Sequence, residues 1–329
     1  MSFRLPDIHN GWTFPIFNNP YYPEVAQESM QWVESFKIFP EDRQKSFRAI
    51  MPGLLASMAY PTLSREHFRA ACDLIAVLYV VDEVSDYLSP EETKALTEQA
   101  GEAIRNPAKG RSTAEHPLVS LHRRTAKTAS DTANRRFVKS YEEFLSSMTQ
   151  EAKDRQNRSV SKSMDDYLAL RRSTGAIKPS LDLLLLPLEI ADDVLDLPVV
   201  KELEVIAIEL IAVANDIFSY NVEQARGDIH NLIVVLMEED EKLTLQMAMD
   251  IAGDWYRERI YDFLECLKRL PVVEPGDQDI LHLHQYARGL GTWVTANYEW
   301  SFECGRFFGD RSQEVRESGI VELLPRYQV

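Results

Sequence analysis

Residues 198–226 read PVVKELEVIAIELIAVANDIFSYNVEQAR, and this stretch decides the fold class. Pro198 suits the first position of a helix, and Gly227 follows the stretch as a stop signal. Apolar residues dominate as far as Ile217, which predicts a helix buried in the centre of a protein. Polar residues then take over, so the helix is expected to pass from an apolar to a polar environment along its own length.

Helical patterns continue on both sides of this stretch. Residues 64–87 are apolar nearly all round between Leu74 and Val81, which predicts a second buried helix. Strand-like alternation is nearly missing. We therefore predict one all-α domain over residues 1–329, in which the Pro- and aromatic-rich residues 1–23 form an N-terminal arm. Further predicted helices cover residues 24–36, 90–105, 118–154, 164–174, 244–270 and 278–308.

Composition excludes several classes of protein. The chain has 36 Lys+Arg against 52 Asp+Glu, and this net charge of −16 argues against binding to nucleic acid or to an anionic membrane surface. No apolar run predicts a membrane span, and no secretory signal pattern opens the sequence. The cysteines at 72, 266 and 304 are too widely spaced for a zinc site or a disulfide framework. We expect a protein of the reducing cytoplasm.

The first acidic cluster is Asp82-Glu83-Val84-Ser85-Asp86, which follows the apolar run of the second buried helix. Asp82 and Asp86 are four residues apart and share one helix face. Two carboxylates side by side repel one another unless a cation lies between them, and their hard oxygens suit Mg²⁺. The alternative is an exposed helix end with solvated charges, which this cluster alone does not exclude.

The second cluster lies inside the opening stretch. Asn215, Ser219 and Glu223 are spaced four residues apart and share one face of the helix. An amide oxygen, a hydroxyl and a carboxylate make an oxygen ligand set that fits a further Mg²⁺ site beside a diphosphate oxygen. Polar groups at the edge of a buried helix need partners, which favours this interpretation over a solvated face.

A third acidic stretch is a literal DDxxD sequence. Asp192, Asp193 and Asp196 lie between Pro187 and Pro198, with no long apolar helix leading into them. We interpret this stretch as a surface connection between helices.

The first two clusters together resemble the aspartate-rich motif and the Asn-Ser-Glu triad of class I terpene synthases. Residues 171–175, RRSTG, resemble the pyrophosphate-sensor segment of the microbial members. By that resemblance Arg171 is the sensor, Thr174 the linker and Gly175 the residue with the effector carbonyl. The implied fold is a single-domain helical bundle around a central apolar cavity.

Residues 300–308, WSFECGRFF, resemble the segment that carries the Arg-Tyr pair of the family, although Phe307 replaces the tyrosine after Arg306. Arg326-Tyr327 is a second candidate for the pair, and the spacing and the preceding residues favour Arg306. The stretches NDIFSYNVEQARGDIHN and LLASMAYP are similar to fungal sesquiterpene synthases of basidiomycete type. Within that group the resemblance is to enzymes that cyclise farnesyl diphosphate through a humulyl cation, such as protoilludene synthases.

A second departure concerns the triad. Many members carry Lys immediately before the triad glutamate, where it contacts the diphosphate, and this chain has Val222. Arg226 lies one turn further along the same face, and we expect it to replace that lysine. The alternative is a positive charge that stabilises a helix C-terminus.

The resemblance implies ionisation of an allylic diphosphate with three Mg²⁺ ions, for which Mn²⁺ is expected to substitute. Asp82 would hold two ions and the triad the third. Asp86 and Glu83 would bind the ions only occasionally, or would contact the residues that hold them. Arg171 and Arg306 would donate bidentate hydrogen bonds to the diphosphate, with help from Asn215 and Arg226. The substrate is a small molecule, and either a monomer or a homodimer fits.

The carbocation formed by ionisation needs a dry apolar cavity, where aromatic faces can stabilise it. Tyr79 lies one turn before Asp82, and Trp293 and Trp300 precede Arg306 at similar positions of their helix. All three are expected to line the cavity, with core packing as the alternative for each.

Two rival functions stay open. A chain-elongating prenyltransferase would use Asp192, Asp193 and Asp196 as a second metal motif and would leave the Asn-Ser-Glu triad unexplained. A non-catalytic all-α scaffold would carry the acidic clusters as solvated helix ends and would not respond to Mg²⁺.

Overall fold

Helices build almost all of the chain that the computed structural model describes, which is residues 1–85, 88–105, 129–157, 161 and 163–327. The α-helices are α1 (Glu24–Glu34), α2 (Glu41–Ala49), α3 (Pro52–Ala59), α4 (Arg65–Ser85), α5 (Pro90–Arg105), α7 (Asp131–Asn157), α8 (Met164–Thr174), α9 (Ile177–Asp182), α10 (Asp192–Leu195), α11 (Pro198–Arg226), α12 (Leu232–Glu239), α13 (Leu245–Lys268), α14 (Gln278–Glu303) and α15 (Ser312–Ser318). Two short 3₁₀ helices cover Leu183–Leu185 and Gly309–Arg311, and the strands are β1 (Ser2–Arg4) and β2 (Ile320–Glu322). The all-α prediction is confirmed.

The predicted helix over residues 278–308 ends early. α14 stops at Glu303, because Cys304 takes an extended backbone with φ −83° and ψ 156°. Arg306 and Phe307 therefore lie in the turn after α14. The predicted helix over residues 118–154 begins at Asp131 in the described chain, and residues 118–128 lie outside it.

The opening stretch of the sequence forms α11, which packs against α8, α12, α13 and α14. α11 is the one helix in the described chain that is long and apolar enough to cross a membrane. However, 83% of its apolar window is buried inside the protein, as expected of the central helix of a bundle. Its left-handed C-terminal residue, Gly227 with φ 87°, ends the helix as the sequence predicts.

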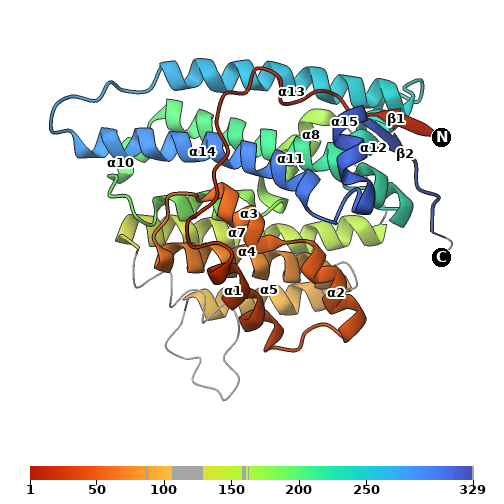
Figure 1. Cartoon of the computed structure of the whole chain (residues 1–329), viewed down its shortest axis with the longest axis horizontal. Coiled ribbons are helices and arrows are strands. Elements are labelled where there is room, and N and C mark those ends of the chain that lie inside the picture. The colour runs from red at the N-terminus through yellow and green to blue at the C-terminus, as the bar shows by residue number, and fades with distance from the viewer. Residues whose placement is uncertain (86–87, 106–128, 158–160, 162, 328–329) are drawn as a thin grey trace.

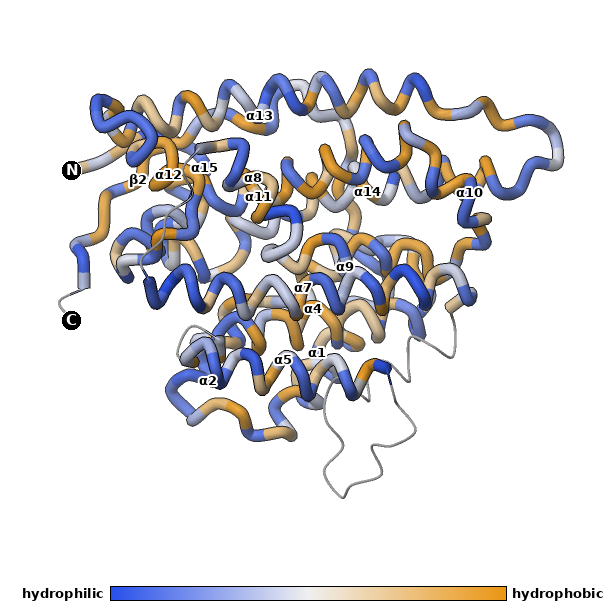
Figure 2. Tube along the Cα trace, turned by 180° about the vertical axis from the view of Figure 1, so that it is seen from behind, coloured by the Kyte–Doolittle hydropathy of each residue, from blue (hydrophilic) through white to orange (hydrophobic). Residues whose placement is uncertain are grey.

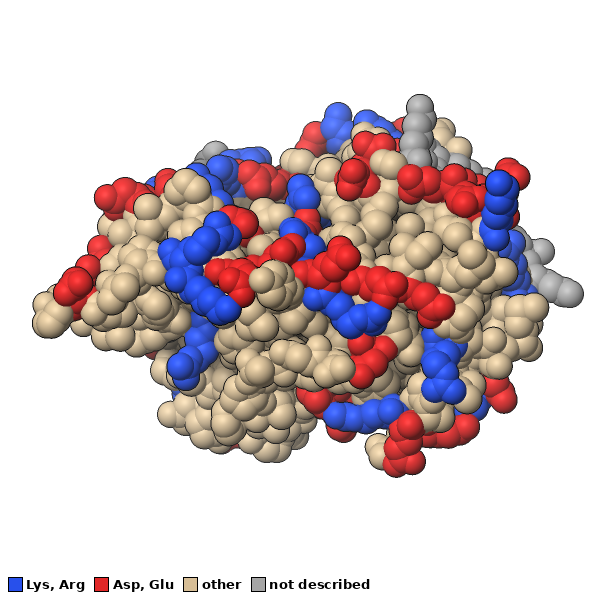
Figure 3. Space-filling model, turned by 90° about the horizontal axis from the view of Figure 1, so that it is seen from above, with Lys and Arg blue, Asp and Glu red and all other residues tan. Residues whose placement is uncertain are grey.

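The other helices surround α11 in two groups (Figure 1). α13 and α14 run side by side with α11, and α3, α4, α5 and α7 form the other side of the bundle (Figure 1). Figure 2 shows hydrophilic and hydrophobic residues alternating along α13, which is typical of a helix with one solvent-facing side. On the face drawn in Figure 3, acidic and basic side chains are intermixed.

The two chain ends lie on the same side of the bundle (Figure 1). β1 pairs with β2 in an antiparallel ladder, with Phe3 opposite Val321. The N-terminal arm then crosses the bundle, where the Trp12 indole donates a hydrogen bond to Thr295 Oγ1 at 3.0 Å and the Asn19 amide donates to backbone carbonyls after α3. The ladder between β1 and β2 fixes the position of β2 and of the residues that follow it.

Shortening a side chain at the centre of α11 should destabilise the whole bundle. Leu210 is fully buried, so Leu210→Ala is expected to lower the free energy of unfolding by about 2–5 kcal/mol through lost apolar contacts and a cavity. Urea denaturation followed by circular dichroism measures the change. Val272→Ala, at a side chain that is 78% exposed, is the control. Equal stability of the two variants would contradict the central position of α11.

Candidate active site

A cavity of about 830 Å³ opens into the bundle between α4, α7, α8, α11 and α14. Its walls differ in character from one end to the other. One part is apolar and includes Leu55, Ile75, Leu78, Phe144, Ile211 and Trp293, whereas the other is charged and includes Asp82, Arg171, Asn215, Glu223 and Arg306. The change from apolar to polar residues along α11 is therefore also the change along the cavity wall.

The predicted triad lies on α11 at the charged part of the cavity. Asn215 and Glu223 line the main cavity. Ser219 is buried and lines a narrow cleft of about 20 Å³, which shares Glu223, Arg226 and Arg306 with the main cavity. That volume accommodates one water-sized group. The structure thus brings Asn215 and Glu223 to the main cavity and Ser219 to the adjoining cleft, and Glu223 lines both spaces.

Arg171 ties α8 to the triad. Its Nη2 donates a hydrogen bond to Asn215 Oδ1 at 3.0 Å, and its Nε and Nη2 each lie 3.3 Å from Asp216 Oδ1. The other oxygen of Asp216 accepts hydrogen bonds from the Tyr167 hydroxyl at 2.7 Å and from the Leu232 amide. Burial alone would lower the pKa of Arg171, but the Asp216 carboxylate raises it above its ordinary value. The guanidinium therefore stays charged at the cavity wall.

Asn231, the N-cap of α12, holds the triad glutamate from outside α11. Its Nδ2 donates to Glu223 Oε2 at 2.9 Å and to the Asp216 carbonyl at 2.8 Å, while its Oδ1 caps the Ile233 amide. Burial, with the nearby Asp216 charge, raises the pKa of Glu223 to about 7. A cation bound by Glu223 would remove that electrostatic penalty, since an opposite charge favours the ionised carboxylate.

The predicted sensor segment lies where α8 breaks. α8 ends at Thr174, and α9 begins at Ile177 after Ala176 has taken a left-handed backbone with φ 53°. Thr174, Gly175 and Ala176 all line the cavity. A non-glycine residue in this conformation is strained, and such strain persists where the surroundings over-determine it, often at functional sites.

The first acidic cluster lies at the end of α4, beside the turn after α14. Arg306 Nη2 donates to Asp82 Oδ2 at 2.7 Å, and Nη1 donates to Glu83 Oε1 at 3.3 Å. The guanidinium also lies 5.2 Å from the ring centre of Tyr79, which is a cation–π distance. Asp82, Tyr79 and Arg306 line the cavity, whereas Glu83 is not among its lining residues. Asp86 lies outside the described residues.

The aromatic predictions have different outcomes. Tyr79 and Trp293 line the cavity, but the lining does not include Trp300. Trp300 is a correction to our expectation: it is fully buried behind Tyr79, with ring centres 5.6 Å apart, and its indole donates to the Ile50 carbonyl at 2.9 Å. Trp300 lies two turns after Trp293 along α14, so Trp293 is at the cavity wall whereas Trp300 is in the core.

Phe307 and Arg226 lie together at the narrow cleft beside the triad. The Phe307 ring is buried and packs edge-on against Trp300 at 5.7 Å. Arg226 is exposed and lines both the cleft and the main cavity. Arg326 and Tyr327, the second candidate pair, also line the main cavity.

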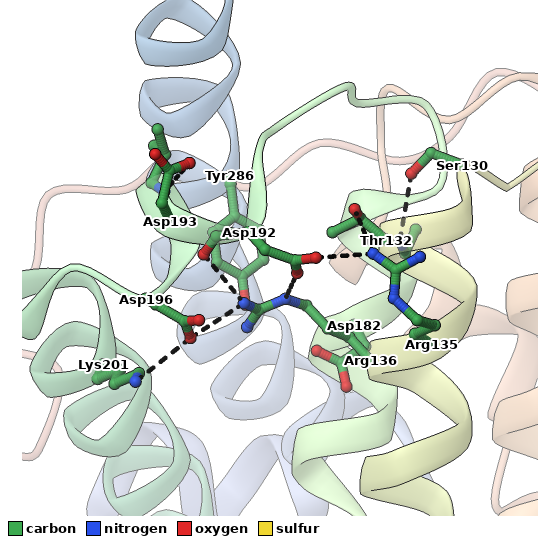
Figure 4. Close-up of polar contacts among 12 residues, drawn as sticks. Ser130, Thr132, Arg135, Arg136, Asp182, Asp192, Asp193, Asp196, Lys201 and Tyr286 are labelled. Carbon is green, nitrogen blue, oxygen red and sulfur yellow. Dashed lines mark hydrogen bonds and ion pairs between the residues drawn. The ribbon is translucent and has the colours of Figure 1, made fainter.

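The DDxxD stretch at residues 192–196 is engaged elsewhere (Figure 4). Asp192 accepts hydrogen bonds from Arg135 and Arg136 of α7 at 2.7 and 3.2 Å, and Asp196 pairs with Arg136 and with Lys201. Hydrogen bonds from these arginines hold the pKa values of both carboxyls below their usual range. None of the three aspartates lines the cavity, so the interpretation as a surface connection fits.

Sequence reasoning missed the residues that support the triad from neighbouring elements. Asp216 belongs to the quoted motif, but its carboxylate turns away from the triad face toward Tyr167. Glu151 and Arg155 of α7 line the cavity as well, and burial raises the pKa of Glu151 to about 7. The polar residues of α7 are a weak signal for such positions, because its sequence shows no motif.

The donor chemistry of the charged part fits divalent metal ions. Among the described residues, no group of three or more His, Cys, Asp or Glu side chains is arranged so that it could hold a metal ion by itself. Asp82, the triad and the cavity space instead offer few carboxylates with room for water or phosphate oxygens, as Mg²⁺ prefers.

Comparison with known proteins supports the same conclusion. The sequence model of the family "Terpene synthase family 2, C-terminal metal binding" matches residues 73–262, which include both Asp82 and the triad. The chain belongs to this terpene synthase family. It is 37% identical to a delta(6)-protoilludene synthase of Armillaria gallica, over 98% of this chain and 94% of that protein. It is also 37% identical to sesquiterpene synthase 9 of Postia placenta, with the same coverage.

Solved structures share the fold of this terpene synthase. The crystal structure of the SVS_A2 protein from ancestral sequence reconstruction aligns with a TM-score of 0.73 and 23% identity, over 88% of each chain. Germacradien-4-ol synthase from Streptomyces citricolor aligns with a TM-score of 0.74 and 21% identity, over 87% of this chain and 97% of that one. Both structures thus show the helical fold that this terpene synthase shares with them.

Loss of the Asn231 side chain should weaken metal binding more than loss of a helix cap elsewhere in the protein. Asn231→Ala is expected to weaken the binding of Mn²⁺ in the presence of diphosphate about 10- to 100-fold, because Glu223 loses the amide that orients it. Electron paramagnetic resonance of free Mn²⁺ measures the affinity. Thr244→Ala removes the matching cap of α13, outside the cavity lining, and is the control. Equal affinities in the two variants would contradict the positioning role.

Proposed function

We propose that the protein is a sesquiterpene synthase that ionises farnesyl diphosphate and cyclises the carbocation to a C15 product, with release of diphosphate. The observation that carries the proposal is one cavity with an oxygen-rich, arginine-rich part and an apolar part. A diphosphate requires the first environment and a hydrocarbon cation the second.

The charged part provides donors for the leaving group. Arg171 and Arg306 now donate to Asn215, Asp216 and Asp82, and their planar guanidinium groups suit bidentate contacts to phosphate oxygens. Neighbouring residues hold both arginines beside the cavity before the substrate arrives, and both guanidinium groups would turn to the phosphate oxygens when metal and diphosphate bind. We propose that Arg226, which lines the narrow cleft, adds a third guanidinium in place of the family lysine.

The metal ions are proposed to be three Mg²⁺, with Mn²⁺ as a substitute. Asp82 would hold two of them, with Asp86 and Glu83 as occasional partners, and Asn215, Ser219 and Glu223 would hold the third. When bound, the ions neutralise the charge of the leaving diphosphate. The residues of the chain then need only to orient the ligand oxygens and to keep water away.

The apolar part is suited to hold the hydrocarbon chain. The whole cavity, with its apolar and charged parts, has a volume of about 830 Å³. This volume lies within the range of about 300–1,000 Å³ that small-molecule sites occupy. Leu78, Phe144 and Ile211 offer no nucleophile to a carbocation. The indole of Trp293 lines the same space, where an aromatic face can stabilise positive charge.

The names of the relatives support a proposal for the substrate length and the product. The names of the relatives from Armillaria and Postia specify sesquiterpene and protoilludene chemistry, so we propose a C15 substrate and a route through a humulyl cation to a protoilludene-type skeleton. We also propose a cytoplasmic location and a monomer or homodimer.

The prenyltransferase alternative needs a second aspartate-rich site on the cavity. Asp192 and Asp196 are instead paired with Arg135, Arg136 and Lys201, outside the cavity lining. A cyclase also accounts for the Asn-Ser-Glu triad, so these contacts favour cyclisation over chain elongation.

Incubation with farnesyl diphosphate and Mg²⁺, followed by gas chromatography of volatile products, tests the function. The wild-type protein is expected to release a cyclic C15 hydrocarbon without added isopentenyl diphosphate. Asp82→Ala and Asn215→Ala should abolish turnover while circular dichroism stays unchanged. Asp192→Ala is the matched control, since its carboxylate binds arginines outside the cavity, and it should keep wild-type turnover. Full activity of Asn215→Ala, or turnover that requires isopentenyl diphosphate, would contradict the proposal.

A further inference from the structure

An amide side chain lies in the cavity wall where the apolar part meets the charged part. Asn297 of α14 is 4% exposed, and it lines the cavity together with Trp293, which lies one turn earlier on the same helix face. Asn297 contacts Ile211 of α11, another lining residue, which lies one turn before Asn215 of the triad. A polar group is therefore present at the edge of the space assigned to the hydrocarbon.

One hydrogen bond orients this amide. Asn297 Nδ2 donates to the Ile211 carbonyl at 3.3 Å, so the nitrogen side of the planar group faces α11. Its Oδ1 lies on the other side and accepts no hydrogen bond from the part of the chain that the structure describes. This oxygen is not enclosed by protein atoms, and Asn297 lines the cavity, so Oδ1 opens into the cavity.

An amide oxygen in a nearly buried side chain needs a partner, because its absence costs about 1–3 kcal/mol. Ser180, another polar side chain of the cavity wall, has one, since its hydroxyl donates to the Ala176 carbonyl at 2.9 Å. Asn297 uses only its nitrogen side within the described chain, which leaves its oxygen for a ligand.

The surroundings of Oδ1 indicate the chemistry of that ligand. Oxygen is the negative end of the amide dipole, so it favours a group with positive charge. The side chains of Trp293 and Ile211 provide no second oxygen, whereas a hard divalent metal ion requires several. A hydrocarbon cation needs no such coordination and fits between an aromatic ring and a carbonyl oxygen.

We propose that Asn297 is a catalytic residue of the cyclisation, whose Oδ1 stabilises positive charge on the hydrocarbon. The inference rests on the proposed function, because the cation is the one formed from farnesyl diphosphate. Its contact with α11 holds the amide before the cation forms, so the dipole is already oriented when charge develops.

No bond to Asn297 forms or breaks in this proposal. The carbon–oxygen bond of the substrate breaks with its electron pair on the diphosphate. Ring closure then uses electron pairs of the substrate's own double bonds. The product becomes neutral by losing a proton, for which the released diphosphate is the base.

A cationic analogue tests the assignment without turnover. The probe is a trialkylammonium analogue of the farnesyl chain, and the reference is the uncharged hydrocarbon of the same shape. Both bind to the full-length protein in the presence of Mg²⁺ and inorganic diphosphate, and tryptophan fluorescence gives the dissociation constants. Asn297→Leu, which is similar in size, is expected to weaken binding of the ammonium probe about tenfold and to leave binding of the hydrocarbon unchanged.

Turnover provides a second measurement. The kcat of Asn297→Leu with farnesyl diphosphate is expected to fall about tenfold or more with little change in KM, since the oxygen acts on the cation rather than on the bound substrate. Asn297→Ala removes the same oxygen without a bulky replacement and should show the same losses. Thr292→Val is the matched control, because it removes a buried hydroxyl of α14 outside the cavity lining and should behave as wild type.

The outcomes separate the inference from the function on which it rests. Loss of ammonium binding with retained hydrocarbon binding, together with a lower kcat, supports the inference. Equal weakening of both analogues, or wild-type behaviour of both Asn297 variants in a protein that converts farnesyl diphosphate, overturns the inference alone.

A bound water molecule is the other ligand that Oδ1 could accept a hydrogen bond from. A wild-type product that carries oxygen from H₂¹⁸O, and that becomes a hydrocarbon in Asn297→Leu, would assign Oδ1 to that water and overturn the inference. A wild-type protein that converts no allylic diphosphate overturns the proposed function as well.

Discussion

The contact of Arg171 with Asn215 and Asp216 is the interaction on which the site depends. It joins the break after α8 to the polar half of α11, at the place where the apolar core of the bundle ends. Asp216 is almost fully buried, and burial raises the pKa of its carboxyl while Arg171 opposes that rise. Removing either partner would leave an uncompensated charge at the cavity wall, which is strongly destabilising.

The same pairing repeats across the cavity. Arg306 donates a hydrogen bond to Asp82, and Arg171 donates one to Asn215. In each case the accepting oxygen is one that we assign as a ligand of a metal ion. Without metal, Arg171 donates to the Asn215 amide oxygen and neutralises the Asp216 carboxylate, while Arg306 neutralises the Asp82 carboxylate. With metal and diphosphate, the same cations can turn to the phosphate oxygens. The net acidity of the protein thus coexists with a site for a polyanion.

The sequence predicts where the helices lie and which residues share a helix face. It predicts less securely which residues of other helices contact that face. The bounds of α11 and the shared edge of Asn215, Ser219 and Glu223 follow from helix periodicity. Asn231, which orients Glu223, comes from the next helix, and periodicity within α11 carries no information about it. Resemblance rather than periodicity pointed to Arg171.

Aromatic positions show the same limit. Trp293 and Trp300 have nearly the same angle on α14, and their neighbours on other elements decide which of them reaches the cavity, since Tyr79 of α4 and the Ile50 carbonyl cover Trp300. The end of α14 is a different case, because Gly305 directly after Cys304 is a common stop signal that the predicted helix over residues 278–308 ran past. The aromatic positions, by contrast, depend on contacts between elements distant in sequence.

A crystal structure with Mn²⁺ and inorganic diphosphate tests the central claim most directly, since the anomalous scattering of Mn²⁺ locates each ion. The account predicts anomalous peaks beside Asp82 and beside Asn215, Ser219 and Glu223, with the diphosphate between them and Arg171 turned toward it. Peaks only beside Asp192 and Asp196, or none at the triad, would contradict it.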